Sequence, residues 1–154
     1  MKKLTCHCGA IEAEVKIPIG GVEKIMRCNC SICKKKGYII GVLGPDDFKL
    51  TKGEDKLTLY QFYTNTAKHY FCSKCGTYIY TDYASAVGRL TVRTKTLDNS
   101  ESFPPQVHIF TKDKDPWLKL TDDVICFEKM YDPKKTWPEE SLKRYGEYLK
   151  VINK

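Results

Sequence analysis

The sequence predicts a mainly β protein with one α-helix near its C-terminus. Short runs of β-forming residues, separated by turns, occupy most of the chain, and helical periodicity is confined to about residues 137–152. A length of 154 residues is typical of one domain, and a chain of this size can bury roughly two-thirds of the surface that it exposes when unfolded. We therefore expect a single domain over residues 1–154 with its own apolar core.

Strands are expected in seven places. Ile11–Ile17 alternates apolar and charged residues, which is the pattern of a half-buried strand, and Tyr38–Leu43 is an apolar run that ends at a Gly-Pro turn. The other five segments are rich in tyrosine, threonine and valine. They are Leu57–Tyr63, Lys68–Cys72, Tyr78–Thr81, Arg89–Arg93 and Ile125–Glu128.

The predicted helix has a start signal and one apolar face. Thr136 and Glu139 have the spacing of a capping box, and Pro138 lies within the first turn, where proline is tolerated. Four apolar residues then share one face and predict that the helix docks against the sheet. They are Leu142, Tyr145, Leu149 and Ile152.

Composition and the N-terminus predict a cytoplasmic protein. Hydrophobic residues make up 42% of the chain and charged residues 29%, and no apolar run approaches the length of a membrane span. Met1-Lys2-Lys3 is not followed by the apolar segment of a signal peptide. The chain has eight cysteines, and in a reducing compartment the seven that lie in tight groups are interpreted as metal ligands rather than disulfides.

Four of the cysteines form two pairs that lie far apart in the chain, Cys6 with Cys8 and Cys72 with Cys75. A glycine follows each pair and allows backbone amides to approach the sulfur atoms. Two such pairs complete one tetrahedral site with four thiolates, and closed sites of this kind are structural zinc sites. We expect this zinc to join the N-terminal strand to the middle of the sheet.

A second group, Cys28, Cys30 and Cys33, places three thiolates in one short loop without a local fourth ligand. Three protein ligands with a vacant fourth position are typical of a catalytic zinc. Two zinc ions per chain are therefore expected. Site partitions that mix the two groups, or a fourth ligand from Cys126 that closes the second site, are the alternatives.

The charge of the second site restricts its chemistry. Three thiolates on a divalent cation leave a net charge of −1, so the metal activates water weakly and is better suited to hold an incoming thiol as a reactive thiolate. The run Lys34-Lys35-Lys36 follows directly and is expected to offset this charge and to attract the carboxylates of a small acidic thiol. The same run also fits an exposed loop without a functional role.

Other side chains are weaker candidates. Cys126 alternates with two apolar residues and is expected to be a buried free thiol. His7 should point outward between two ligands, and His69 should face away from Cys72 if that strand is regular. His108 is expected to be a packed, hydrogen-bonded histidine rather than a catalytic one.

The net charge of +7 supports a rival interpretation. Residues 1–80 carry 13 basic and 7 acidic side chains, against 13 and 12 in residues 81–154, so the excess lies in the half that holds the cysteine groups. This suggests an anionic partner, or else a surface that is only solubilising. The rival function is a non-catalytic zinc module that binds nucleic acid or protein. Against it, the chain has four arginines, no long basic tail and no aromatic residues interleaved with a basic patch.

Taken in order, the cysteine motifs match a known family. Cys-x-Cys-Gly-Ala at residues 6–10, Cys-x-Cys-Ser-x-Cys with its basic run at residues 28–36, and Phe-Cys-x-x-Cys-Gly at residues 71–76 together resemble the glutathione-dependent formaldehyde-activating enzyme family, which also includes centromere protein V. His108-Ile109-Phe110 and Pro116-Trp117-Leu118 are similar to its later motifs. The resemblance runs from about Thr5 to Phe127, and the C-terminal helix lies beyond it.

The resemblance implies a β-tent fold of antiparallel sheets. It implies a structural zinc on Cys6, Cys8, Cys72 and Cys75, and a catalytic zinc on Cys28, Cys30 and Cys33. The implied activity is that of a carbon–sulfur lyase, the reversible formation of S-hydroxymethylglutathione from formaldehyde and glutathione. A lyase that acts on another thiol adduct would have the same metal loop.

Overall fold

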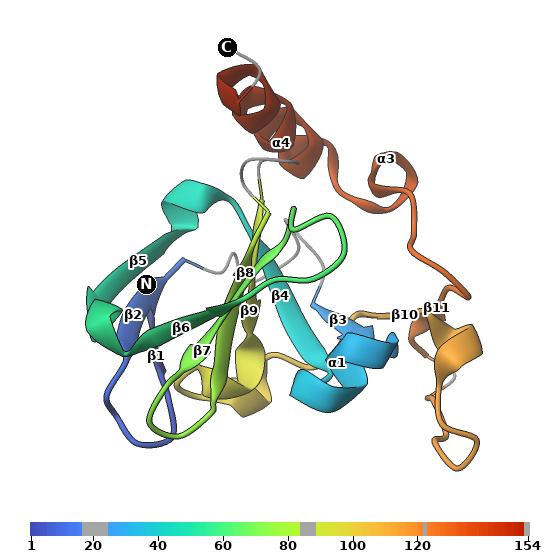
Figure 1. Ribbon diagram of the computed structural model, residues 1–154. Helices are drawn as coiled ribbons and strands as arrows, with labels where there is room; N and C mark the ends of the chain where they lie inside the picture. Colours follow the sequence, from blue (N-terminus) through green and yellow to red (C-terminus); the bar gives the residue numbers. More distant parts are fainter. Residues whose placement is uncertain (17–24, 84–88, 122, 153–154) are drawn as a thin grey trace.

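The computed structural model describes residues 1–16, 25–83, 89–121 and 123–152. Its strands form two sheets of unequal size, and the C-terminal helix lies at one end of the molecule (top of Figure 1). The chain is therefore mainly β with a C-terminal helix, as the sequence predicts. Within the described ranges, no helix is long and apolar enough to cross a membrane.

The smaller sheet is antiparallel, in the order β1 (Lys2–Thr5), β2 (Glu12–Val15) and β5 (Phe48–Lys52). In β2, Ala13 and Val15 are buried while Glu14 is exposed, because alternate side chains of a strand point to opposite faces. This confirms the alternating strand predicted from Ile11, although Ile17 lies outside the described residues.

The larger sheet contains eight strands among the described residues, in the order β11-β10-β3-β4-β9-β8-β7-β6. Strand β10 pairs in parallel with β3 and β11, and the other pairings are antiparallel. Six of the predicted strands correspond to β4, β6–β9 and β11, the last being shorter than the predicted Ile125–Glu128. The bounds are β3 (Met26–Cys28), β4 (Ile39–Leu43), β6 (Leu57–Tyr60), β7 (Lys68–Cys72), β8 (Tyr78–Asp82), β9 (Leu90–Arg93), β10 (Val107–Ile109) and β11 (Ile125–Cys126).

The buried apolar residues form two clusters. The first combines residues of both sheets, such as Leu4 and Val15 with Ile79 and Val92, and therefore lies where the sheets pack together. The second surrounds Cys28, and its members come from β3, β4 and β10 of the larger sheet, from Cys33, and from the C-terminal residues Tyr131 and Trp137. Each fully buried aliphatic side chain contributes about 1.5–3 kcal/mol to folding, so both clusters stabilise the chain.

The C-terminal segment forms α3 (Pro133–Thr136) and α4 (Glu139–Ile152). Trp137 lies between them, is 6% exposed, and donates a hydrogen bond from Nε1 to the Tyr131 hydroxyl at 2.8 Å. Leu142 and Tyr145 pack against the second apolar cluster, whereas Val151 is exposed. The first half of α4 therefore docks against the second apolar cluster, Leu149 farther along the predicted face is half-buried, and the side chain of Ile152 lies outside the described residues.

The start of this helix differs from the prediction. Thr136 is not its N-cap, because Thr136 ends α3 and its hydroxyl donates to the carbonyl oxygen of Asp132 at 3.0 Å. The first turn of α4 instead begins at Pro138, whose carbonyl oxygen accepts hydrogen bonds from the backbone amides of Ser141 and Leu142.

Candidate metal centres

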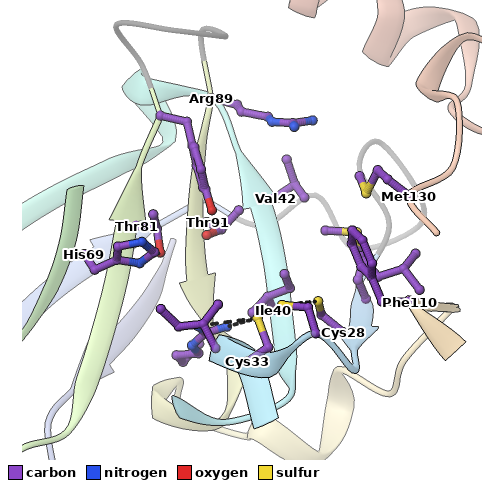
Figure 2. Close-up of a pocket in the computed structure, with 16 residues that line it drawn as sticks. Cys28, Cys33, Ile40, Val42, His69, Thr81, Arg89, Thr91, Phe110 and Met130 are labelled. Atoms are coloured by element: carbon purple, nitrogen blue, oxygen red, sulfur yellow. Dashed lines mark hydrogen bonds between the residues drawn. The ribbon is translucent and has the colours of Figure 1, made fainter. Parts of the chain in front are cut away.

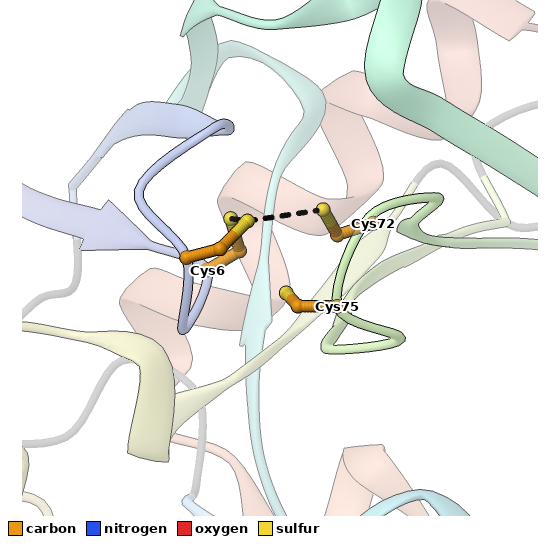
Figure 3. Close-up of side chains that lie close together, drawn as sticks. Cys6, Cys72 and Cys75 are labelled. Atoms are coloured by element: carbon orange, nitrogen blue, oxygen red, sulfur yellow. Dashed lines mark hydrogen bonds between the residues drawn. The ribbon is translucent and has the colours of Figure 1, made fainter.

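The first group of cysteines gathers at a junction between the two sheets (Figure 3). Cys6 and Cys8 follow β1, Cys72 ends β7, and Cys75 lies in the turn between β7 and β8. All four Sγ atoms lie within 4.8 Å of one another, with 3.6 Å between Cys6 and Cys8 and 3.8 Å between Cys8 and Cys72. A tetrahedral ion with metal–sulfur bonds of about 2.3 Å separates its sulfur ligands by about 3.8 Å. The four thiols therefore can hold one metal ion.

Two turns that each contain a glycine with a positive φ angle present these thiols. Gly9 and Gly76 follow the two pairs with φ angles of +70° and +69°, a region that costs other residues about 1–2 kcal/mol. Each glycine amide donates to the carbonyl oxygen of the first cysteine of its pair, Cys6 or Cys72, and the Ile11 amide donates to Cys6 Sγ at 3.2 Å. The glycines thus allow the tight turns that aim both pairs at one point.

One of these thiols is set up to ionise. The hydroxyl of Thr77 lies 3.2 Å from Cys75 Sγ, and this hydrogen bond lowers the pKa of the Cys75 thiol to about 5. A low pKa favours the thiolate, which is the form that binds metal ions.

The second group of cysteines lies at the end of β3. Cys28 is the last residue of that strand, Cys30 precedes α1 (Ser31–Lys36), and Cys33 lies within the first turn of this helix. Their Sγ atoms also lie within 4.8 Å of one another, and those of Cys28 and Cys30 are 3.4 Å apart. Among the described residues, no fourth cysteine, histidine or carboxylate joins the group. Three thiols therefore can hold an ion and leave one coordination position open.

Asn29 anchors this loop. Its side chain is fully buried, and both its backbone amide and its Nδ2 donate to the carbonyl oxygen of Ile109, at 3.1 and 3.0 Å. Since Ile109 ends β10, which pairs with β3, the neighbouring strand fixes the position of the loop.

The hydrogen bonds within the second group place negative charge on one thiol, Cys30, because they lower its pKa while they raise the pKa of Cys28. Hydrogen bonds from Cys28 and Cys33 hold the pKa of the Cys30 thiol far below its usual range. The guanidinium of Arg93 lies beside the group, with its two terminal nitrogens 3.9 and 4.0 Å from Cys33 Sγ. Arg93 is 6% exposed, and no ion pair joins it to an acidic side chain within the described ranges.

A cavity of about 240 Å³ opens beside this group (Figure 2). Its walls come from one face of the larger sheet, because antiparallel pairing places residues of successive strands directly opposite each other. Besides the three cysteines, the cavity is lined by Arg89, Tyr83 and apolar residues such as Phe110 and Met130. Two cross-strand rows complete it: His69, Thr81, Thr91 and Val42 in one, and Arg93, Ile40 and Met26 in the next.

Sequence reasoning missed three polar residues of this cavity, His69, Arg89 and Arg93. His69 was expected to face away from Cys72, and this is confirmed. Cys72 belongs to the first group of cysteines, whereas His69 lines the cavity beside the second group. The signal for the arginines was present in the sequence, because Arg89, Thr91 and Arg93 alternate along the predicted strand Arg89–Arg93 and so share one face. Which other residues lie beside that face depends on the order of the strands in the sheet.

The lysine run lies outside this cavity. Lys34 forms an ion pair with Asp115 at 2.8 Å, and Lys35 is exposed. The Nζ atom of Lys36 lies 4.5 Å from the ring centroids of both Tyr60 and Tyr78 and has no hydrogen-bond partner. None of the three lysines lines the cavity. Their role as substrate ligands therefore stays a prediction that the residues of the cavity do not support.

The structure also places the remaining candidates. The prediction that Cys126 is buried is wrong: its side chain is exposed, because β11 is a two-residue strand at the edge of the sheet and no described strand pairs with its far side. Cys126 belongs to neither cysteine group. His7 is exposed, as predicted. His108 is 6% exposed and packed, as predicted, but its Nδ1 has no hydrogen-bond partner and it lines a different cavity.

Comparison with known proteins identifies similar sequences and structures. A crystal structure of a Rhodobacter sphaeroides protein is 40% identical in sequence, over 63% of this chain and 88% of that chain, with a TM-score of 0.57. The sequence model of the glutathione-dependent formaldehyde-activating enzymes matches residues 1–113, a range that contains all seven cysteines of the two groups. Because this match spans well over half of its length, the chain belongs to the glutathione-dependent formaldehyde-activating enzyme family.

Proposed function

We propose that this protein is a zinc-dependent carbon–sulfur lyase that forms or cleaves the adduct of a small thiol and an aldehyde, with glutathione and formaldehyde as the first candidates. The observation that carries the proposal is the group Cys28, Cys30 and Cys33, which offers three sulfur ligands beside a cavity and no fourth among the described residues. The family to which the chain belongs supports glutathione and formaldehyde as reactants.

We propose zinc for both cysteine groups, because thiolate ligands and tetrahedral sulfur spacings suit this ion. The closed group on Cys6, Cys8, Cys72 and Cys75 would be structural and the open group catalytic. On this view residues 1–154 are one zinc-binding domain of the β-tent type. The cysteines are all free, which fits a reducing compartment, and we propose the cytoplasm.

The proposed reaction needs only a metal site, a compensating positive charge and a cavity from the protein. When bound, the zinc ion would keep an incoming thiol in its thiolate form. Cys28, Cys30 and Cys33 hold the ion with one side open to the cavity, and Arg93 offsets the negative charge of the thiolates. Apolar residues such as Val42 line part of the cavity beside the metal site.

The reaction needs no oxidant or reductant. In the forward direction the thiol loses its proton, the sulfur forms a bond to the aldehyde carbon, and the carbonyl oxygen takes up a proton. In the reverse direction that carbon–sulfur bond breaks. A cavity of about 240 Å³ lies below the range of about 300–1,000 Å³ for pockets that enclose a drug-sized ligand, and so suits the thiol end of a substrate with a small aldehyde.

The direct test follows the exchange between formaldehyde, glutathione and their adduct by NMR, with the zinc-loaded protein and with a chelator-treated control. We expect zinc-dependent acceleration over the uncatalysed exchange. Cys30→Ser should abolish it and lower the zinc content, whereas Cys126→Ser, outside both groups, should change neither. If protein that holds two zinc ions gave no acceleration with any thiol and aldehyde, the lyase proposal would be wrong.

The alternative is a non-catalytic zinc module that binds nucleic acid or protein, and the net charge of +7 favours it. DNA binding that persists at physiological ionic strength and weakens with added salt, in protein without turnover of small molecules, would support this alternative.

A further inference from the structure

His69 is a polar group of the cavity with one ring nitrogen unused. β7 places its ring in the cavity wall next to Thr81, its cross-strand partner in β8 (Figure 2). The residue is 4% exposed, and its Nε2 is buried with no hydrogen-bond partner. Buried polar atoms in proteins are nearly always paired, so an unpaired nitrogen in the wall of a ligand-sized cavity indicates a bound partner.

The hydrogen bonds of the other ring nitrogen, Nδ1, determine whether Nε2 carries the proton of the neutral ring. Nδ1 lies within hydrogen-bond distance of the Tyr78 hydroxyl and 3.2 Å from the Thr81 hydroxyl. The Tyr78 and Thr81 hydroxyls are also 2.5 Å apart, and either can donate to the other. Burial raises the pKa of Tyr78 to about 12, so the phenol keeps its proton at neutral pH and, when it accepts from Thr81, can donate that proton to Nδ1. When Nδ1 accepts in this way, the single proton of a neutral imidazole is on Nε2, the unpaired atom.

The charged groups around His69 keep the ring neutral. Burial, followed by the positive charges of Lys36 and Arg93, lowers the pKa of His69 to about 4, while Cys30 acts in the opposite direction. The rings of Phe62 and Tyr60 cover the imidazole at centroid distances of 5.2 and 6.3 Å. A neutral imidazole is a hydrogen-bond donor that can stabilise negative charge on a substrate oxygen without losing its proton.

We propose that His69 is a catalytic residue that donates a hydrogen bond from Nε2 to the aldehyde oxygen while the thiolate adds to the carbon. This role rests on the proposed function. The thiol has already released its proton to solvent, the carbon–sulfur bond forms as the carbonyl π electrons move to oxygen, and the oxygen then takes a proton from water. His69 keeps its own proton throughout, and in the reverse direction it stabilises the same oxygen while the carbon–sulfur bond breaks.

Two matched variants test this role. The amide nitrogen of His69→Gln reaches the position of Nε2, whereas the shorter side chain of His69→Asn ends near the position of Nδ1. Removing one donor to a developing oxyanion costs about 100–1,000-fold in kcat, so we expect a loss of that size in His69→Asn and recovery to within about tenfold of wild type in His69→Gln. Zinc content and the KM for the thiol should change little in both variants.

A spectroscopic measurement on the unmodified protein tests the same role independently of turnover. Long-range ¹H–¹⁵N correlation spectra of the ¹⁵N-labelled, zinc-loaded protein at pH 7.5 should show His69 as the neutral tautomer with its proton on Nε2. A proton on Nδ1, a charged ring, or wild-type kcat in His69→Asn would each overturn the proposal. These results differ from failure of the lyase function, which would appear as the absence of turnover in zinc-loaded wild-type protein.

Discussion

At the scale of single residues, charge balance is the main property of the cavity. With a divalent cation bound, the three thiolates would leave a net charge of −1, which Arg93 beside Cys33 can offset. Arg89 also lines the cavity and forms no ion pair among the residues that the structure describes. This leaves one positive charge for the substrate, so we expect Arg89 to contact a carboxylate of the thiol.

This expectation predicts how a substitution changes substrate preference. Arg89→Met should raise the KM for glutathione by about 10- to 150-fold, since a hydrogen bond to a charged group contributes about 1.5–3 kcal/mol, and should leave the KM for 2-mercaptoethanol, which has no carboxylate, unchanged. Lys49→Met, on the exposed side of β5, serves as the control for loss of one positive charge. Equal effects of Arg89→Met on both thiols in steady-state kinetics would contradict the assignment.

Residues of the site differ in how well the sequence predicts them. The seven cysteines are predictable because ligands of one ion lie within a few residues of each other or in repeated Cys–Gly turns. His69 and Arg93 are not, because they come together only when β7, β8 and β9 pair in register. Cys126 was misjudged because alternation with apolar neighbours does not reveal that its strand lies at the edge of a sheet.

At the scale of elements, the tight turns and short helices follow local backbone rules. Strands β4 and β6–β9 have clear β-forming composition and were predicted, whereas β10, with three residues, was not. Helix α1 spans six residues and has no apolar periodicity, so only the cysteine spacing pointed to an ordered loop there. Its last turn carries the three lysines, which suits the negative end of the helix dipole.

Two glycines in different elements should respond oppositely to the same substitution. Gly146 lies inside α4 with open space where an added methyl group would lie, so Gly146→Ala should stabilise the fold by about 1 kcal/mol. Gly76 has equal space but a φ angle of +69°, so Gly76→Ala should destabilise it by about 1–2 kcal/mol. Urea denaturation of the zinc-loaded proteins measures both effects, and midpoints that shift in the same direction would refute this account.

At the scale of the whole molecule, the two cysteine groups have different surroundings. The first joins the loop after β1 of the smaller sheet to the turn after β7 of the larger one, so a metal there links the two sheets. The second lies within the other apolar cluster and faces the cavity. The sequence predicted this partition from spacing, but the packing of each group could be known only from the arrangement of both sheets.

The most direct test of an open, thiol-binding metal site uses the protein with cobalt(II) in place of zinc, because the visible absorption of cobalt reports its ligands. We predict that glutathione changes the spectrum of the protein with both sites loaded, as a fourth sulfur joins Cys28, Cys30 and Cys33, and that Cys30→Ser removes this change. A spectrum that glutathione leaves unaltered, with two cobalt ions bound per chain, would contradict the central claim.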